Sequence, residues 1–453
     1  MASHTKTMTE GKPAFLILTF ALPLMIGNVF QQLYTVVDTM VVGKALGVPA
    51  LAAIGAADWM NWLMLGVIQG ITQGFGILMA QAFGAGKYKE LRQTVGCSAI
   101  LSLLSSVLLL CAGQCIAHPV LSLLQTPPEI MDNALLYLRI MYLGVPIVMS
   151  YNLFATILRS LGDGRTPLLA MIAAAVVNIL LDLLFVLVFG FGIGGAAAAT
   201  LIAQLFSSLF CLYRIRRIEV LSLCPADFCL QGHLPAKLLM LGFPMAFQNA
   251  VISVGGMIVQ FVVNGFGVIF IAGFTATNKL YGVLEVAATS YGYSMITYAG
   301  QNLGAGKITR IRKGMRAALT ISLVTSALIA AVMLLFGRAI LSGFISGTPQ
   351  EFELTLQVAY RYLAVMSTFL PILYILHVTR STIQGMGNTV LPMVSGIAEF
   401  IMRAASAILL PAVVGESGIF YAEIMAWAGA DLILVISYFV VIKKMETQAV
   451  PTL

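Results

Sequence analysis

Acidic and amide side chains interrupt several long apolar stretches of this chain, where a polar group is costly. Asp38 lies in one stretch, while Asn178 and Asp182 lie in another, four residues apart on one face of a helix. A charged side chain at the centre of a membrane helix costs about 2.5–3.5 kcal/mol on insertion scales, so such acids mark ion and proton pathways. Because removal from water raises the pKa of a carboxylate, acids in such a setting could take up and release a proton.

Hydroxyl groups extend this polar set. Tyr34 shares a helical face with Asp38, and Thr200 lies in the apolar stretch that follows Asp182. At 1.5 Å per residue, Asp38, Thr200 and Asp182 lie roughly 8–12 Å below the outer ends of their stretches, and Asn178 lies roughly 18 Å below. An oxygen-only set suits either a proton or Na⁺, which as a hard cation is expected to prefer oxygen ligands. The sequence leaves that choice open, and a hydrogen-bonded structural cluster is the alternative. The sodium ligands would be Asp38, Asn178, Asp182 and Thr200.

Further polar groups lie in the second half of the chain. Glu399 precedes Arg403 by four residues, which is the favourable order for an intrahelical ion pair. Glu285 has no charged partner at helical spacing, so it either has a structural role or faces a second-half cavity that attracts cations. Gln248 and Asn249 are candidates for the same cavity. The sequence assigns no role to two further acids, Glu423 and Asp431.

The composition shows why these groups are unusual. Of 453 residues, 60% are hydrophobic and 9% are charged, whereas a soluble domain carries about 25% charged residues. A soluble enzyme and a disordered chain are both excluded, since disorder requires low hydrophobicity and high charge. The net charge of +7 is better explained by basic cytoplasmic loops than by nucleic acid. We therefore expect an all-α membrane protein that binds no nucleic acid.

Apolar stretches of sufficient length recur along the whole chain, since a bilayer crossing takes about 20 residues. Twelve spans are predicted at 14–43, 51–82, 94–117, 133–158, 168–190, 194–213, 238–264, 269–302, 317–340, 354–380, 391–412 and 419–442. With both termini in the cytoplasm, the inner segments hold 19 Lys and Arg and the outer loops hold 2. This asymmetry obeys the positive-inside rule and predicts a multi-pass protein of the cytoplasmic (inner or plasma) membrane.

The chain contains an internal repeat. Residues 80–87 (Ala-Gln-Ala-Phe-Gly-Ala-Gly-Lys) return at 300–307 as Gly-Gln-Asn-Leu-Gly-Ala-Gly-Lys, a shift of 220. Further pairs in the same order are Pro23 and Pro244, Gly162 and Gly387, and Pro167 and Pro392. Parallel repeats of this kind are typical of secondary transporters. The predicted parts are a six-helix lobe at 1–213, a cytoplasmic linker at 214–237 and a second six-helix lobe at 238–453.

Small residues in the second predicted span indicate close helix packing. Gly66, Gly70 and Gly74 stand four apart on one face. This spacing lets the backbone of a neighbouring helix approach closely.

Four motifs resemble those of the multidrug and toxic compound extrusion (MATE) family, in the same order and across residues 14–442. They are Val-Asp-Thr-Met-Val-Val-Gly at 37–43, the doubled Gln-x-x-Gly-Ala-Gly-Lys, Leu-Arg-Ser-Leu-Gly-Asp-Gly-Arg-Thr-Pro at 158–167, and Asn178-x-x-x-Asp182. The resemblance implies two six-helix bundles around a central cleft. It also implies export of amphipathic organic cations in exchange for protons or sodium, with no other cofactor. In the first half, the residues implied to line the cavity and bind the coupling ion are Tyr34, Asp38, Asn178, Asp182 and Thr200.

Pro23 provides a possible hinge in this scheme, because proline removes a backbone hydrogen bond and can kink a helix. Our hypothesis is that ion binding at Asp38 and Asp182 biases bending at Pro23 and thereby displaces the drug. The predicted spans 7 and 10 contain no Asp or Glu, which argues against a sodium site in the second half.

Two alternatives remain from the sequence. A lipid-linked oligosaccharide flippase of a related fold would line its cleft with several basic residues, whereas membrane-embedded bases are few here. An integral membrane enzyme would need a catalytic constellation, and His118 and His377 are isolated in the sequence. We therefore expect a transporter and not an enzyme. Its expected substrates are small organic cations, and we expect it to be a monomer surrounded by membrane lipid.

Overall fold

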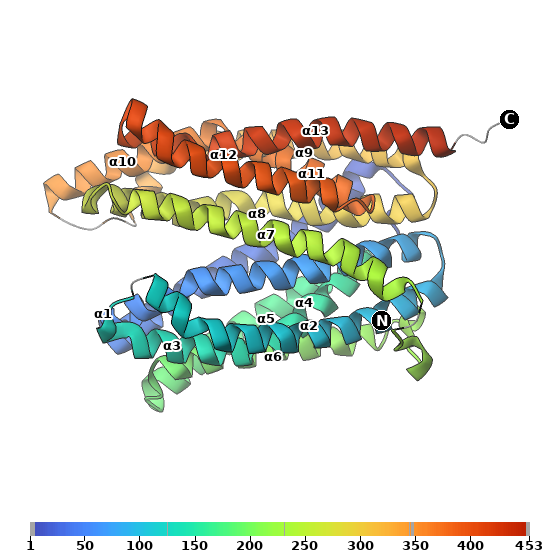
Figure 1. Cartoon of the computed structure of the whole chain (residues 1–453), viewed down its shortest axis with the longest axis horizontal. Coiled ribbons are helices and arrows are strands. Elements are labelled where there is room, and N and C mark those ends of the chain that lie inside the picture. The colour runs from blue at the N-terminus through green and yellow to red at the C-terminus, as the bar shows by residue number, and fades with distance from the viewer. Residues whose placement is uncertain (1–4, 125, 231, 344, 346–347, 450–453) are drawn as a thin grey trace. The chain divides into compact units, whose positions relative to one another are not determined.

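The structure is a computed structural model that describes residues 5–124, 126–230, 232–343, 345 and 348–449; side chains at 33–40, 44, 48, 51 and 448–449 are not described. Within this part of the chain, every regular element is a helix (Figure 1). The first half contains α1 (Pro13–Gly84), α2 (Tyr88–Leu123), α3 (Pro128–Leu143), α4 (Val145–Ser160), α5 (Arg165–Asp182), the π-helix η1 (Leu183–Val188) and α6 (Gly192–Ile215). Two short 3₁₀ helices follow, η2 (Glu219–Leu221) and η3 (Pro225–Asp227). The second half contains α7 (Leu234–Val263), α8 (Val268–Gly304), α9 (Ile308–Ser342), α10 (Pro349–Thr368), α11 (Leu370–Gly385), α12 (Val390–Val414), the 3₁₀ helix η4 (Glu416–Tyr421) and α13 (Ala422–Ala449).

These helices have the length and composition of membrane spans. Among the described residues, nine helices qualify singly, and each of two bent pairs, α3 with α4 and α10 with α11, adds one more. The 37-residue α8 is a further long helix that is not among them. The break between the first two predicted spans falls at Gly47, whose φ of 79° interrupts α1. The chain is thus an all-helical, multi-pass membrane protein, and the count of twelve spans stays a prediction.

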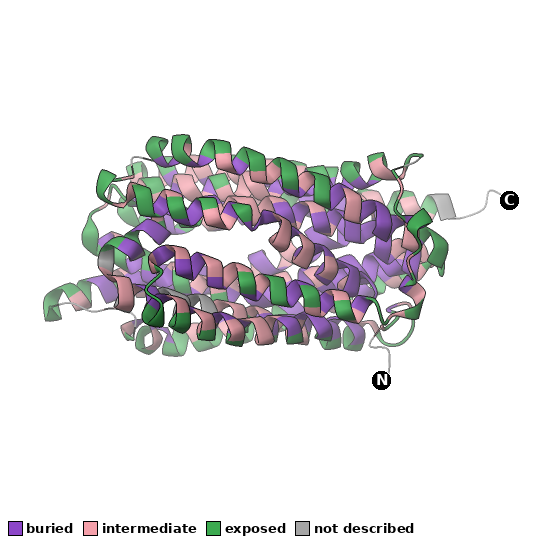
Figure 2. Ribbon diagram, turned by 90° about the horizontal axis from the view of Figure 1, so that it is seen from below, coloured by how far each residue is buried: buried purple, intermediate pink, exposed green. Residues whose placement is uncertain are grey.

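The long helices expose apolar side chains and bury small polar ones. On α9, Val324, Leu328 and Leu335 are exposed along one face, while Ser322 and Ser326 are fully buried. Figure 2 shows exposed residues along the outer sides of the helices and buried residues toward their neighbours. A soluble protein would instead bury most leucine and valine side chains and expose most serines. Lipid as the surrounding solvent explains the pattern, because small residues allow close packing in membranes.

The contacts divide the chain into two compact units. Unit 1 comprises residues 1–7 and 22–250, and unit 2 comprises residues 8–21 and 251–453. The chain therefore passes from one unit to the other within α1 and again within α7. Compared with the predicted lobes, the contacts assign the linker 214–237 and the start of α7 to unit 1. They assign the start of α1 to unit 2.

The expected close packing of the second span is present within unit 1. A Cβ atom on Gly70 would lie 2.4 Å from the backbone of Ala246, and one on Gly74 would lie 2.4 Å from that of Gly242. The amide of Asn249 also donates to the carbonyl of Gly66, at 2.9 Å. The three glycines thus provide the surface on which the first half of α7 packs.

The second copy of the doubled motif binds the N-terminal segment within unit 2. The backbone N–H of Met8 donates to Gln301 Oε1 at 2.7 Å, and the Asn302 amide donates back to the carbonyl of Met8 at 3.1 Å. Lys307 and Arg310 donate to the carbonyls of Thr9 and Gly11. This copy of the motif therefore satisfies backbone groups that precede α1, which is a structural role.

The repeat seen in the sequence recurs in the backbone geometry. The α3–α4 pair bends by 48° and the α10–α11 pair bends by the same 48°. Glycines with positive φ precede the last two helices of each half, a conformation that glycine adopts without steric cost. They are Gly162 and Gly192 in the first half and Gly387 and Gly415 in the second. Each half is thus built from the same sequence of elements.

Substitution of Gly74 tests the helix contact with α7. We expect Gly74→Val to lower the melting temperature in detergent, because overpacking of a tight contact costs about 1–3 kcal/mol. Gly55→Val is the matched control, since a Cβ on Gly55 would meet no atom within 4 Å. Equal melting temperatures for the two variants would contradict the packing described.

Candidate functional site

A cavity lies inside unit 1, between α1, α4, α5 and α6. Its lining combines polar side chains with small apolar ones, and the polar groups come from all four helices. The lining residues are Gln31, Tyr151, Met171, Ala174, Asn178, Thr200, Ala203, Gln204 and Ser207. Two residues singled out from the sequence, Asn178 and Thr200, therefore line one cavity.

Asn178 and Asp182 are the most deeply buried polar groups of this region. Both side chains belong to residues with 0% exposure. Asp182 is the last residue of α5, and the π-helix η1 begins directly after it. Single π-helical turns inside α-helices are rare and occur frequently at functional sites. The wider turn thus coincides with a buried acid that the sequence had singled out.

The Asn178 amide has no hydrogen-bond partner among the described side chains and backbone groups. Among the described residues, neither its Nδ2 nor its Oδ1 atom has a hydrogen-bond partner, and the same holds for Gln204 Oε1. Burial of an amide without a hydrogen bond costs about 1–3 kcal/mol by mutational measures. Unsatisfied buried groups in native structures call for an explanation such as a bound water or ion. The cavity therefore has the chemistry of a site for a ligand with polar contacts.

Thr200 contributes an oxygen that can accept further contacts. Its hydroxyl donates to the carbonyl of Ala196 at 3.1 Å. Because a hydroxyl has one donor and two lone pairs, this bond leaves the oxygen able to accept a hydrogen bond or to bind a cation.

Two predicted site residues, Tyr34 and Asp38, lie outside the described side chains, although the α1 backbone that carries them is helical. Gln31, one turn before Tyr34, lines the cavity. The backbone at Pro23 is also helical within α1, and the contacts change from unit 2 to unit 1 between Ala21 and Leu22, directly before this proline. The roles of Tyr34, Asp38 and Pro23 stay predictions.

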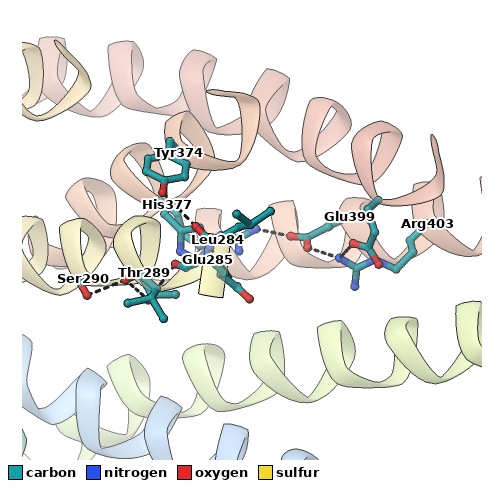
Figure 3. A network of polar contacts seen from close by, with 11 residues as sticks. Leu284, Glu285, Thr289, Ser290, Tyr374, His377, Glu399 and Arg403 are labelled. Atoms are coloured by element: carbon teal, nitrogen blue, oxygen red, sulfur yellow. Dashed lines mark hydrogen bonds and ion pairs between the residues drawn. The ribbon is translucent and has the colours of Figure 1, made fainter. Parts of the chain in front are cut away.

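Unit 2 contains a buried chain of ion pairs. The Glu399 carboxylate lies between two guanidinium groups, those of Arg380 and Arg403 (Figure 3). Arg403 Nη2 lies 2.8 Å from Glu399 Oε1 and also 2.8 Å from Glu423 Oε2. The predicted Glu399–Arg403 pair is confirmed, and it is part of a larger network. Buried charges are costly unless they are paired, and in this network each of the four charged groups has an oppositely charged partner.

The residues of the predicted second-half cavity belong to both units. Glu285 has no charged partner at helical spacing, but His377 Nε2 lies 3.5 Å from Glu285 Oε1 within unit 2. His377, isolated in the sequence, therefore has an acidic neighbour in the fold. Gln248 and Asn249 belong to unit 1, where Gln248 is 2% exposed and Asn249 bonds to Gly66. The second-half cavity stays a prediction.

Sequence reasoning missed several groups of these sites. Ser207 follows Thr200 by seven residues on the same face of α6, and this spacing could have identified it. Tyr151 and Arg380 carry no such signal, because each reaches its site from another helix than the residues that the sequence singled out.

The helical architecture, the repeat and the buried polar cavity together define a two-repeat membrane transporter fold. The MatE family model matches residues 23–184 and 244–409. Since these regions cover more than half of the chain, the protein belongs to the MatE family.

Individual relatives agree with this assignment. The probable multidrug resistance protein YoeA of Bacillus subtilis (strain 168) is 29% identical over 354 residues, 76% of this chain and 75% of that protein. The probable multidrug resistance protein YpnP of the same organism is 28% identical over 412 residues, 91% of each chain. A crystal structure of MATE in the bent conformation superposes with a TM-score of 0.88 at 22% identity, covering 98% of both chains. This last likeness shows that the fold is shared.

Replacement of Asn178 tests whether its amide is unsatisfied. We expect Asn178→Leu to leave the melting temperature unchanged or to raise it, because an unmet buried polar group costs about 1–3 kcal/mol. Asn152→Leu is the matched control: Asn152 is also buried, but its amide donates to the carbonyl of Val148 at 2.8 Å. The control variant should be less stable than the wild type. Clear destabilisation by Asn178→Leu would show that the protein satisfies this amide.

Replacement of Glu399 tests the ion network. Glu399→Gln should destabilise the protein by about 3–5 kcal/mol, because it leaves buried arginine charge uncompensated. Glu353→Gln serves as the control, since Glu353 pairs with Arg338 at an exposed position where 59% of its side chain is accessible. Thermal unfolding in detergent distinguishes the two. A Glu399→Gln variant as stable as the control would contradict the account of the network.

Proposed function

We propose that this protein is a secondary active transporter that exports amphipathic organic cations from the cell in exchange for protons or sodium. The observation that carries the proposal is the cavity of unit 1, in which the fully buried Asn178 amide has no hydrogen-bond partner among the described residues. A bound cation or a protonated neighbour would satisfy the Oδ1 atom of this amide, whereas its Nδ2 amino group would need an acceptor. The names of the relatives YoeA and YpnP, both probable multidrug resistance proteins, support the substrate class.

The coupling site would use oxygen ligands only. Asn178 Oδ1, Thr200 Oγ1 and the Asp182 carboxylate are the donors that α5 and α6 offer, with Asp38 and Tyr34 as further donors from α1. A sodium ion would bind these oxygens directly, whereas a proton would reside on an aspartate. Among the described residues, no group of three or more His, Cys, Asp or Glu side chains is arranged to hold a metal ion, so a sodium site would depend on amide and hydroxyl oxygens as well.

Coupling requires the cavity to communicate with the drug. We propose that its occupancy changes the bend of α1 at Pro23, where a missing backbone hydrogen bond makes bending less costly. The place of Pro23 directly after the change of unit supports this role. Bending there would change the space available to the drug without a rearrangement of α5 and α6.

The orientation follows from the charge asymmetry. Placing both termini in the cytoplasm puts 19 basic residues on the inner side and 2 on the outer side, as the positive-inside rule requires. We propose that the protein functions as a monomer in the cytoplasmic membrane. The transport cycle needs only the ion gradient, the organic cation and the surrounding lipid.

Efflux from proteoliposomes tests the proposal. We expect export of a fluorescent organic cation to be driven by an imposed pH or sodium gradient, each tested separately. Asp38→Asn and Asp182→Asn should each reduce gradient-driven efflux at least about tenfold, in line with removal of a group worth about 1.4 kcal/mol or more in the transport cycle. Glu353→Gln, at an exposed position, should transport as the wild type does. Unchanged gradient-driven efflux by either aspartate variant would contradict the role of that residue.

A further inference from the structure

The internal repeat relates the cavity of unit 1 to the ion network of unit 2, residue by residue. Gly162 and Pro167 match Gly387 and Pro392 at a shift of 225, and α5 and α12 begin at residues 165 and 390, the same shift. At this shift the counterpart of Asn178 is Arg403. The counterpart of Ala174, which also lines the cavity, is Glu399.

The neighbouring helices give the same correspondence. Gly192 is the first residue of α6, and Gly415 directly precedes η4, which leads into α13. Both glycines have positive φ, and their shift of 223 places Glu423 opposite Thr200. Pro23 and Pro244 are related by a shift of 221, which places Ile252 opposite Gln31. All four counterparts therefore come from positions that line the cavity in unit 1.

These four counterparts are joined by one guanidinium group. Arg403 Nη2 contacts Glu399 and Glu423, each at 2.8 Å, and Arg403 Nη1 donates to the carbonyl of Ile252 at 3.1 Å. Arg403 is 5% exposed and Glu399 is 2% exposed. The place that is an open polar cavity in unit 1 is thus filled in unit 2 by a positive charge that belongs to the chain.

We propose that Arg403 is a built-in cation which occupies the second-half counterpart of the coupling site, so that only the first half exchanges an ion during transport. The site beneath it, formed by Glu399, Glu423 and the carbonyl of Ile252, is a latent site for a monovalent cation. The inference that only the first half exchanges an ion rests on the proposed function of unit 1. The latent site itself rests only on the contacts within unit 2.

Charge balance predicts what the latent site would take. The contacts join two arginines, Arg380 and Arg403, with two glutamates, Glu399 and Glu423. Without Arg403, Glu399 keeps its pair with Arg380, while Glu423 loses its ion-pair partner. One negative charge would remain, which a single sodium ion or proton can neutralise. The other charged or titratable side chains around Glu423 and Arg403 are Tyr281, Glu285 and Tyr362. Arg380 and Asp431 lie near Glu399, and His377 lies beside Glu285.

The test is thermal unfolding of Arg403→Asn in detergent, with sodium exchanged for choline at constant ionic strength and, separately, with varied pH. Asparagine reproduces the residue found at the equivalent place in unit 1. We expect the melting temperature of R403N to rise by about 2 °C for each tenfold increase in sodium or in proton concentration, as expected for a cation that binds only the folded state. The additional substitution Glu423→Gln should abolish this dependence, because R403N/E423Q again has balanced charge.

Two controls define the comparison. Every variant of this test carries Asp182→Asn so that binding in unit 1 does not contribute. Asp182→Asn with Arg403 in place should lack the dependence. Arg338→Asn removes an arginine from an exposed ion pair, and water then solvates the remaining carboxylate. The melting temperature of this variant should therefore respond to sodium and pH as that of the protein with Arg338 does.

Two results would overturn the proposal. They are an R403N variant insensitive to both sodium and pH, and a dependence that persists in R403N/E423Q. If neither variant folds, equilibrium sodium and proton binding by Asp182→Asn decides: a cation bound at Glu423 despite Arg403 would show that the second-half site is open, and its absence is the expected result. Efflux unaffected by Asp182→Asn would instead overturn the proposed function while leaving the R403N result intact.

Discussion

The free energy that a polar group loses when it leaves water is the constraint on which both halves of this protein depend. Inside a membrane, the chain must satisfy such a group itself or leave it to a ligand. Unit 2 satisfies the buried Glu399 carboxylate with arginine, since it lies between Arg380 and Arg403. At the place equivalent to Arg403, unit 1 leaves the Asn178 amide without a partner among the described residues. This difference between two equivalent places is the basis for proposing ion exchange in the first half.

The scaffold explains how such a cavity can persist. The long helices bury serines and glycines beside their apolar core and direct many leucines and valines outward, so the helices pack closely. Gly70 and Gly74 admit the backbone of α7, and Asn249 bonds to Gly66 beside them. The π-helix η1 begins directly after Asp182 and changes the helical register at the end of α5.

The sequence predicted the features that repeat along one helix or along the chain. Hydropathy predicted long membrane helices, the gap between the first two predicted spans contains the break at Gly47, and the four-residue spacing of Glu399 and Arg403 identified their ion pair. The sequence could not predict contacts between different helices. His377 meets Glu285 from 92 residues away, Tyr151 enters the cavity from α4, and Arg380 reaches Glu399 from α11. Helical spacing carries no information on which faces meet, since packing against other helices decides it.

Charge movement on ion binding provides the most direct test of the first-half site. Proteoliposomes adsorbed on a solid-supported membrane, without any drug, would be exposed to a sudden rise in proton or sodium concentration. The account predicts a transient current for one of the two ions, which disappears when Asn178→Leu and Asp182→Asn are combined and persists in Glu353→Gln. A current of undiminished size in the double variant would contradict the assignment of ion binding to this cavity.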